Sequence, residues 1–159
     1  MRTAVLTIST TLARGEGDDR SGDELVRLAE EAGCELVARE VVSDDAEAIA
    51  TALRAQVAAD AALVFTTGGT GLTPDDVTPE ATRAVIEREA PGITEAMRAV
   101  SREHTPMAVL SRAVAGIRGA TLIVNFPGSP KAVEECFGVL ELVLPHAVRT
   151  LRGESRHGH

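Results

Sequence analysis

Aromatic residues are scarce in this sequence: they make up 2% of its 159 residues, and tryptophan and tyrosine are absent. Without large rings, the core must be built mainly from valine, leucine, isoleucine and alanine. Proteins that bind single-stranded nucleic acid stack bases on aromatic side chains, and phosphate backbones select basic surfaces. The net charge is −8, so the sequence predicts no nucleic-acid partner. A phosphorylated small molecule stays compatible with this charge, because one local site can override the overall field.

Cysteine and long apolar runs are also lacking. Cys34 and Cys136 have neither a metal-binding nor a redox spacing, so we expect two small buried side chains in a reducing compartment. No segment approaches the ~20 apolar residues that a membrane-spanning helix needs. Met1 leads straight into a strand-like run without the features of a secretion signal. The sequence therefore predicts a cytoplasmic protein without a membrane partner.

The length favours one domain, because 159 residues bury a substantial core without disulfides or metals. No internal repeat or linker is visible. We expect the domain to cover residues 1–152, followed by a flexible tail over residues 153–159 that is polar and contains glycine. His157 and His159 are interpreted as part of that tail rather than as metal ligands.

Strand-like and helix-like patterns alternate along the chain. Strands are predicted at residues 3–9, 35–42, 61–66, 109–117 and 121–126, and a polar loop at residues 10–21. A first helix is expected from Gly22 to a cap at Gly33, and a second after Ser43 and Asp44. A third should begin at a cap at Thr78 and break at Pro91-Gly92, where a fourth begins and runs to about Arg102. The last should run from about Lys131 to Pro145. This order implies a three-layer α/β/α domain with a mainly parallel sheet and a short antiparallel hairpin.

The segment after the third strand carries the clearest functional signal. Three glycines with flanking hydroxyls follow Phe65, and glycines let backbone N–H groups turn toward one point and approach an anion closely. The segment is not a P-loop, since no Gly-Lys-Ser/Thr follows, and Leu72-Thr73-Pro74 departs from the dinucleotide fingerprint. A plain tight turn would explain two glycines, whereas three favour an anion site. The residues assigned to this site are Thr67, Gly68, Gly69, Thr70 and Gly71.

Two carboxylates follow strands that end at one edge of the predicted sheet, where ligands of such folds bind. Asp44 comes after the second strand and Asp76 after the glycine-rich turn. Each has an ordinary alternative: Asp44 fits a helix N-cap with Glu47 three residues on, and Asp76 fits a turn. We expect the two to project from neighbouring loops, where they could hold Mg²⁺, which would neutralise a polyphosphate. Alternatively, one of them would orient a hydroxyl or a water.

Lys131 and Arg112 are candidate phosphate ligands. Lys131 starts the last helix, where the helix dipole disfavours a cation, so it is either an anion ligand or a solvated surface lysine. Arg112 follows Ser111 in the predicted fourth strand and is either a phosphate clamp or a guard of an edge strand. His104 has no partner visible in the sequence. No nucleophile set of the Ser/His/Asp or Cys/His type emerges.

At these residues the chain resembles the MogA/MoaB family of molybdenum-cofactor biosynthesis proteins, over nearly its whole length. The motifs that carry the resemblance are Thr66-Thr67-Gly68-Gly69-Thr70-Gly71, Asp76-Val77-Thr78-Pro79, Glu80-Ala81-Thr82, Asp19-Arg20-Ser21-Gly22, Met97-Arg98, Leu110-Ser111-Arg112 and Pro127-Gly128-Ser129-Pro130-Lys131-Ala132. Together they are highly specific, whereas the glycine-rich turn alone is not.

The resemblance implies a homotrimeric molybdopterin adenylyltransferase. Such an enzyme uses Mg²⁺ and ATP to join AMP to molybdopterin, releases pyrophosphate, and hands the product to a molybdenum insertase. It implies catalytic, Mg²⁺-binding roles for Asp44 and Asp76. Further substrate-binding positions in this chain would be Ser21, Gly22, Ser111, Arg112, Gly128, Ser129 and Lys131.

Two other functions stay open at this point. Family members often carry Ser-Asp after the first strand, where this chain has Ser9-Thr10-Thr11. That difference favours a carrier or scaffold that binds molybdopterin without adenylyltransferase turnover, unless Asp18 or Asp19 replaces the missing carboxylate. The third hypothesis is a generic α/β module that binds phosphosugars or nucleotides without a preference for pterin.

Overall fold

The computed structural model describes residues 1–154. Its strands are β1 (Arg2–Ile8), β2 (Glu35–Val42), β3 (Leu63–Thr67), β4 (Arg88–Glu89), β5 (Ala115–Arg118) and β6 (Thr121–Phe126). Its α-helices are α1 (Thr10–Ala13), α2 (Arg20–Glu31), α3 (Ala46–Ala58), α4 (Thr78–Val85), α5 (Pro91–Arg102), α6 (Pro130–Leu140) and α7 (Leu144–Leu151), with a short 3₁₀ helix, η1 (Pro106–Leu110).

The strands form one sheet in the order β2-β1-β3-β6-β5-β4. The pairs β1–β2, β1–β3 and β3–β6 are parallel, whereas β5 pairs antiparallel with β6 and with β4. Every residue of the central strands β3 and β6 is buried, as expected for strands covered on both faces. The predicted mainly parallel sheet with an antiparallel hairpin is therefore confirmed.

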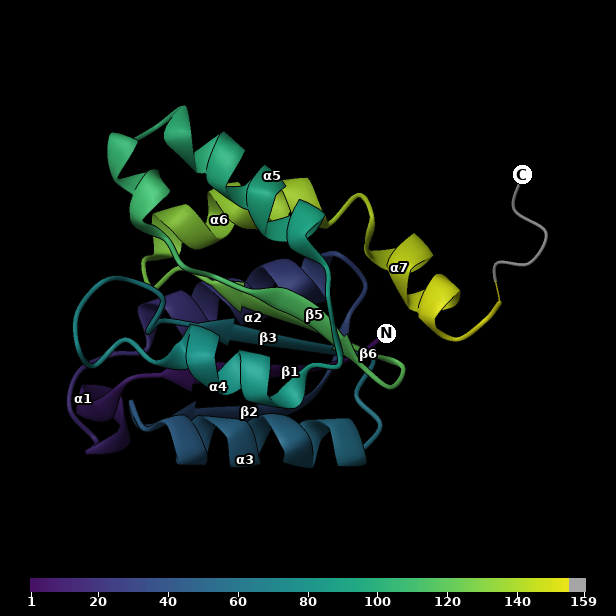
Figure 1. Cartoon of the computed structure of the whole chain (residues 1–159), viewed down its shortest axis with the longest axis horizontal. Helices are drawn as coiled ribbons and strands as arrows, with labels where there is room; N and C mark the ends of the chain where they lie inside the picture. Colours follow the sequence, from purple (N-terminus) through teal and green to yellow (C-terminus); the bar gives the residue numbers. More distant parts are fainter. Residues whose placement is uncertain (155–159) are drawn as a thin grey trace.

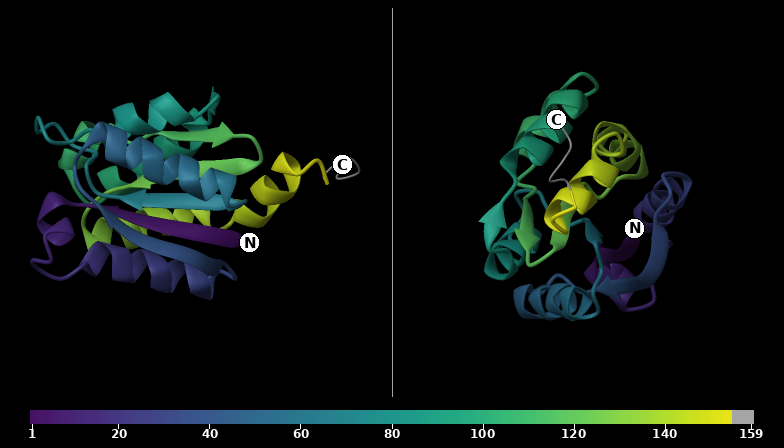
Figure 2. Two further views of the ribbon diagram at one scale, coloured as in Figure 1. Left: turned by 90° about the horizontal axis from the view of Figure 1, so that it is seen from below. Right: turned by 90° about the vertical axis from the view of Figure 1, so that its right-hand side faces the viewer.

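Helices cover both faces of the sheet, which gives the three layers (Figure 1). Helices α2, α5 and α6 pack on one face, where the scarce aromatic residues gather: Phe65, Phe126 and Phe137 are fully buried in that core. Helices α3 and α4 cover the other face over a core of small and branched aliphatic side chains. Helix α7 extends beyond the amino ends of the parallel strands, so it lies at the opposite end of the molecule from their carboxyl ends (Figure 2).

Local sequence signals explain where the helices begin and end. The Asp19 carboxylate caps α2 by accepting a bond from the Gly22 N–H. After α2, Gly33 adopts a φ of 88°, the left-handed conformation that closes many helices. Pro91 and Pro145 each lie in the first turn of a helix, where proline is favoured. Pro145 therefore belongs to the start of α7 and does not end α6.

Several predicted boundaries are wrong. The expected loop at residues 10–21 contains the short helix α1 and the start of α2, and β4 was not predicted. The largest error concerns residues 109–117: only the end of this run belongs to β5, and the residues before it form η1 and an extended connection. The apolar side chains of Val109 and Leu110 are 60% and 43% exposed, so the start of this run is not the interior of a sheet.

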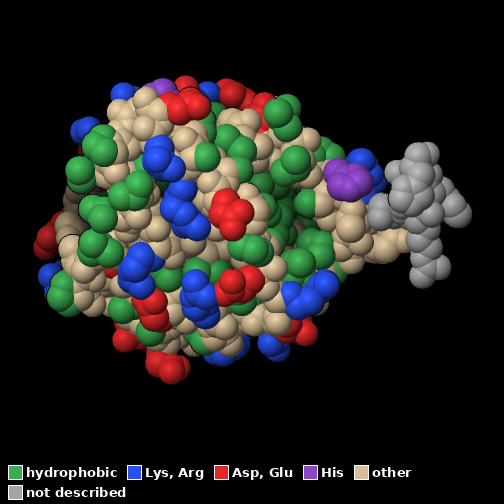
Figure 3. All heavy atoms as spheres, turned by 45° about the horizontal axis from the view of Figure 1, so that its top comes forward, with side chains coloured by type: hydrophobic (Ala, Val, Ile, Leu, Met, Phe, Trp, Pro, Cys, Tyr) green, Lys and Arg blue, Asp and Glu red, His purple; other side chains and the backbone are tan. Residues whose placement is uncertain are grey.

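The surface carries mixed charges. On the face shown in Figure 3, basic, acidic and hydrophobic side chains are interspersed rather than sorted into one basic surface. Among residues 1–154, no helix is long and apolar enough to cross a membrane. Cys34 and Cys136 are both buried and free, as predicted. His157 and His159 lie outside the described residues.

Candidate functional site

The glycine-rich turn leaves β3 in a conformation that only glycine adopts readily. Gly68 and Gly69 have φ values of 98° and 70°. A Cβ atom on Gly68 would lie 2.5 Å from the Ile8 carbonyl oxygen, and one on Gly69 would lie 2.3 Å from Thr78 Oγ1. Positive φ and close backbone approach therefore both require glycine here.

The turn directs its carbonyls into the protein and leaves N–H groups free. The Gly68 and Gly69 oxygens accept bonds from the Thr78 hydroxyl and N–H at 3.0 and 3.1 Å. The Thr70 and Gly71 oxygens accept bonds from the Arg112 N–H and Nε, both at 2.8 Å. Within the described residues, the N–H groups of Gly69, Thr70 and Gly71 have no acceptor. Consecutive free N–H groups of this kind form an anion-binding concavity.

Thr78 and Arg112 thus shape the turn. Thr78 was expected to cap α4, but α4 has no side-chain cap and the Thr78 hydroxyl bonds to the turn instead. Arg112 also donates to the Asp76 carbonyl at 2.7 Å and to both carboxylate oxygens of Glu80. Those bonds lower the pKa of Glu80 below its usual range. Arg112 lies outside any strand, so its interpretation as an edge-strand guard is wrong, and most of its donors already have partners.

A second segment, residues 127–131, joins β6 to the first turn of α6 and lies against the glycine-rich turn. The buried Thr67 hydroxyl donates to the Pro127 carbonyl at 2.6 Å, so it joins the two loops rather than lining a cavity. A Cβ on Gly128 would lie 3.4 Å from the Gly68 Cα. Ser129 caps α6 by accepting the Ala132 N–H. Lys131 is exposed and forms no ion pair within residues 1–154.

The carboxylate of Asp76 lies beside the turn. Its Oδ2 accepts a bond from the Thr73 N–H at 3.0 Å, which is the turn role that the sequence allowed. A Cβ on Gly71 would lie 2.8 Å from that same oxygen, so the carboxylate and the turn backbone are in close contact. No bond to Asp76 Oδ1 is formed within the described residues, so that oxygen is available to a ligand.

Asp44 lies at the same edge of the sheet but is used differently. Its Oδ2 accepts bonds from the N–H and hydroxyl of Thr10 at 2.9 and 3.0 Å, and its own N–H donates back to that hydroxyl. Asp45, not Asp44, caps α3 through the Ala48 N–H, so the capping alternative for Asp44 is wrong. The expectation of neighbouring loops is also wrong, because β1 lies between β2 and β3.

The start of α2 packs closely on the end of β1. Asp19 Oδ2 accepts from the Thr7 hydroxyl at 2.8 Å and from Arg39 at 3.2 Å. A Cβ on Gly22 would lie 2.5 Å from Thr7 Oγ1, so glycine is needed for this approach. Ser21 and Gly22 are buried and border none of the main cavities. Asp19 therefore acts here as a structural carboxylate.

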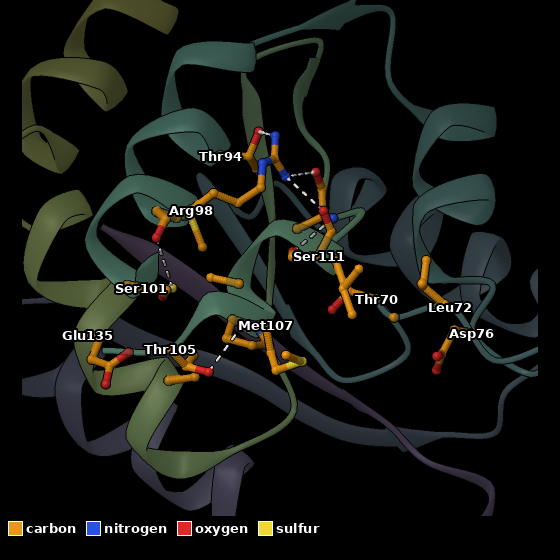
Figure 4. Close-up of a pocket in the computed structure, with 18 of the residues that line it drawn as sticks. Thr70, Leu72, Asp76, Thr94, Arg98, Ser101, Thr105, Met107, Ser111 and Glu135 are labelled. Carbon is orange, nitrogen blue, oxygen red and sulfur yellow. Dashed lines mark hydrogen bonds between the residues drawn. The ribbon is translucent and has the colours of Figure 1, made fainter. Parts of the chain in front are cut away.

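A cavity of about 500 Å³ opens beside the glycine-rich turn. Figure 4 shows Thr70, Leu72 and Asp76 at one end and Thr105 and Glu135 at the other. Its walls come from the turn, α5, η1, the segment after η1 and α6. The lining residues that are central to the site are Thr70, Gly71, Asp76, Met97, Met107, Leu110, Ser111, Ala132, Glu135 and Cys136.

Of the predicted site residues, Thr70, Gly71, Asp76 and Ser111 line the cavity. The other predicted residues of these segments do not line it: Thr67, Gly68, Gly69, Arg112, Gly128, Ser129 and Lys131. Asp44, Ser21 and Gly22 lie at the same sheet edge but outside that cavity. Sequence reasoning missed the cavity wall and the buried Asn125, which bonds to Thr66 and Thr82. One signal was present, since an asparagine in the apolar run of β6 needs hydrogen-bond partners.

Comparison with known proteins identifies the family and agrees with the fold. The family model described as "Probable molybdopterin binding domain" matches residues 4–146. The chain belongs to the MogA/MoaB family. A crystal structure of the molybdopterin biosynthesis enzyme MoaB from Thermus thermophilus superposes with a TM-score of 0.90 at 44% identity, covering 96% of each chain.

Relatives in this family differ greatly in length. The molybdopterin adenylyltransferase of Helicobacter pylori J99 is 46% identical over 91 residues, which is 57% of this chain and 52% of the relative. The molybdenum cofactor synthesis protein cinnamon of Drosophila melanogaster is 42% identical over 150 residues, covering 92% of this chain. The chain spans only 25% of the length of cinnamon. Membership assigns the chain to molybdenum-cofactor biosynthesis.

Proposed function

We propose that the chain transfers AMP from ATP to the terminal phosphate of molybdopterin and releases pyrophosphate. The observation that carries this proposal is the glycine-rich turn, in which four carbonyls are bonded inward and the N–H groups of Gly69, Thr70 and Gly71 are free. A relative named molybdopterin adenylyltransferase shares 46% identity over 91 residues and supports the choice of reaction.

The chain's own groups would act mainly by positioning. The turn would hold phosphate oxygens, and the adjoining loop of residues 127–131 would add Lys131 and the N-terminus of α6, where an anion is favoured. Thr78 and Arg112 fix the turn before a ligand binds, so its N–H groups need no reorganisation during the reaction. Preorganised donors and correct placement of two phosphates supply most of the acceleration in reactions of this kind.

Magnesium fits the carboxylates only in part. Among residues 1–154, no group of three or more His, Cys, Asp or Glu side chains is arranged to hold a metal. Mg²⁺ is often bound by one or two carboxylates, with water and substrate phosphates as its other ligands. Asp76, with a free Oδ1 beside the turn, suits that role, and Asp44 at the same edge is the second candidate. Bound Mg²⁺ would offset the negative charge of the phosphates.

The substitution Asp76→Asn tests the catalytic assignment. Asparagine keeps the shape and the bond from the Thr73 N–H but removes the negative charge. We expect pyrophosphate release in the presence of molybdopterin and Mg-ATP to fall by about 100-fold or more, as for loss of a key electrostatic group, while the melting temperature and pterin binding change little. Asp75→Asn is the matched control, because Asp75 is exposed and does not line the cavity. Unchanged turnover in the Asp76→Asn variant would refute its assigned role.

The second candidate is a carrier that binds molybdopterin without using ATP. The observation that favours it is the engagement of Asp44 with Thr10, because these bonds make a proposed catalytic carboxylate a link to the start of α1. Purified protein incubated with molybdopterin and Mg-ATP separates the candidates: a carrier retains the pterin but forms no pyrophosphate. A homotrimer, an insertase partner and a cytoplasmic location remain part of the proposal.

A further inference from the structure

Glu135 is a carboxylate without a hydrogen-bond donor at the far end of the cavity. Its side chain is 12% exposed, and His104 Nδ1 lies 3.8 Å from Glu135 Oε1, beyond hydrogen-bond distance. No hydrogen bond to its carboxylate is formed within the described residues. Figure 4 shows Glu135 across the cavity from Thr70 and Asp76. A largely buried carboxylate facing an open cavity needs donors from a ligand or from water.

The rest of this end of the cavity offers little to a polar ligand. Cys136 bonds to the Ser101 hydroxyl at 3.4 Å, and burial raises the pKa of its thiol, so the thiol stays uncharged. The Thr105 hydroxyl already accepts the Met107 N–H at 3.2 Å. The walls between the two ends are largely apolar, with Met97 among them. The cavity therefore has the glycine-rich turn at one end, largely apolar walls to which Arg98 also contributes, and the Glu135 carboxylate at the other end. The Arg98 guanidinium already donates to Thr94 and to the carbonyls of Ser111 and Ala113.

The pairing with His104 does not explain why Glu135 is buried. The imidazole is 46% exposed, and ion pairs at such positions contribute little. A ligand with paired N–H donors would satisfy the carboxylate better, because two parallel bonds to one carboxylate add both strength and orientation.

We propose that Glu135 recognises the 2-amino-4-oxo pyrimidine edge of a pterin whose phosphate lies at Gly69–Gly71. That edge presents an exocyclic amino group and a ring N–H side by side, which match the two oxygens of a carboxylate. Adenine lacks this donor pair, because its ring nitrogens beside the amino group are acceptors. Glu135 is thus a specificity-determining residue, and this inference rests on the proposed molybdopterin function.

Two small probes test the inference without ATP: 6-hydroxymethylpterin phosphate, and the matching lumazine phosphate, in which a carbonyl replaces the 2-amino group. At this position the lumazine presents a carbonyl acceptor to Glu135, whereas the pterin presents an amino donor. By calorimetry, we expect the wild-type protein to prefer the pterin by roughly ten- to hundredfold. In Glu135→Gln the amide can both donate and accept, so the preference should fall to about threefold or less.

Glu134→Gln is the matched control, because Glu134 is its exposed neighbour on α6 and does not line the cavity; it should keep the wild-type preference. Equal binding of both probes by the wild-type protein, or an unchanged preference in Glu135→Gln, would overturn the inference.

Either of these results, obtained while the wild-type protein still releases pyrophosphate, would leave the proposed function standing. A preference lost in Glu135→Gln, without pyrophosphate release by the wild-type protein, supports the inference and contradicts the adenylyltransferase. If neither probe binds the wild-type protein, the inference and the proposed pterin site both fall.

Discussion

At the scale of single residues, the site depends on a few side chains that hold a backbone in place. Thr78 and Arg112 bond to the carbonyls of the turn, and within the described residues the N–H groups of Gly69, Thr70 and Gly71 have no acceptor, so they would be available to the proposed phosphate. The glycines themselves were readable from the sequence. The residues that hydrogen-bond to the turn could not be identified from the sequence. Their role depends on contacts between positions distant along the chain, as between Gly71 and Arg112.

The substitution Gly69→Ala tests this residue-level account. Alanine would carry a Cβ 2.3 Å from Thr78 Oγ1 at a φ of 70°. Both the turn and the hydrogen bond from the Thr78 hydroxyl to the Gly68 carbonyl must therefore shift. We expect the melting temperature to fall and the affinity for 6-hydroxymethylpterin phosphate to drop at least tenfold.

Gly119→Ala is its matched control. Gly119 has a φ of 58°, but a Cβ on this residue would meet only open space, so alanine there should cost only the left-handed backbone strain of about 1–2 kcal/mol. Phosphate binding should be unchanged in this variant. If Gly69→Ala binds the pterin phosphate like Gly119→Ala, the shape of the turn is not what creates the site.

At the scale of elements, the clearest predictions were those with strong local patterns. Strands 35–42 and 121–126 were predicted with the bounds of β2 and β6, because both are β-rich runs bounded by turn residues. The run at residues 109–114 is rich in apolar residues and was therefore predicted as a strand. In the structure, Val109 and Leu110 are exposed, and only Ala113 and Val114, next to β5, are buried. Strand β4 has only two residues, which is too short for any periodic pattern to be visible.

The start of α3 shows the difference between a cap and a site residue. Asp45 accepts the Ala48 N–H at 2.9 Å, whereas Asp44 links the loop to Thr10. In urea unfolding, Asp45→Ala should lower the free energy of unfolding by about 1 kcal/mol and leave adenylylation unchanged. Glu47→Ala is the control, because Glu47 lies in the same first turn without a capping bond. Loss of activity in Asp45→Ala with normal stability would contradict this division of roles.

At the scale of the whole molecule, the order of elements alone predicted the class of fold. It also indicated the edge of the sheet where the candidate cavity lies. What it did not predict was the strand order. Placing β1 between β2 and β3 separates Asp44 from Asp76, two residues that a linear reading puts on adjacent loops. The cavity was also invisible in sequence, because its wall combines α5, η1 and α6 with the turn.

The central claim is that free backbone N–H groups of the glycine-rich turn bind a phosphate. Titrating ¹⁵N-labelled protein with 6-hydroxymethylpterin phosphate and following the amide resonances tests it most directly. The account predicts that the amides of Gly69, Thr70 and Gly71 show the largest saturable shifts, with smaller changes for Gly128 and Ser129. Saturable binding that leaves the Gly69–Gly71 amides unmoved while resonances elsewhere shift would contradict it.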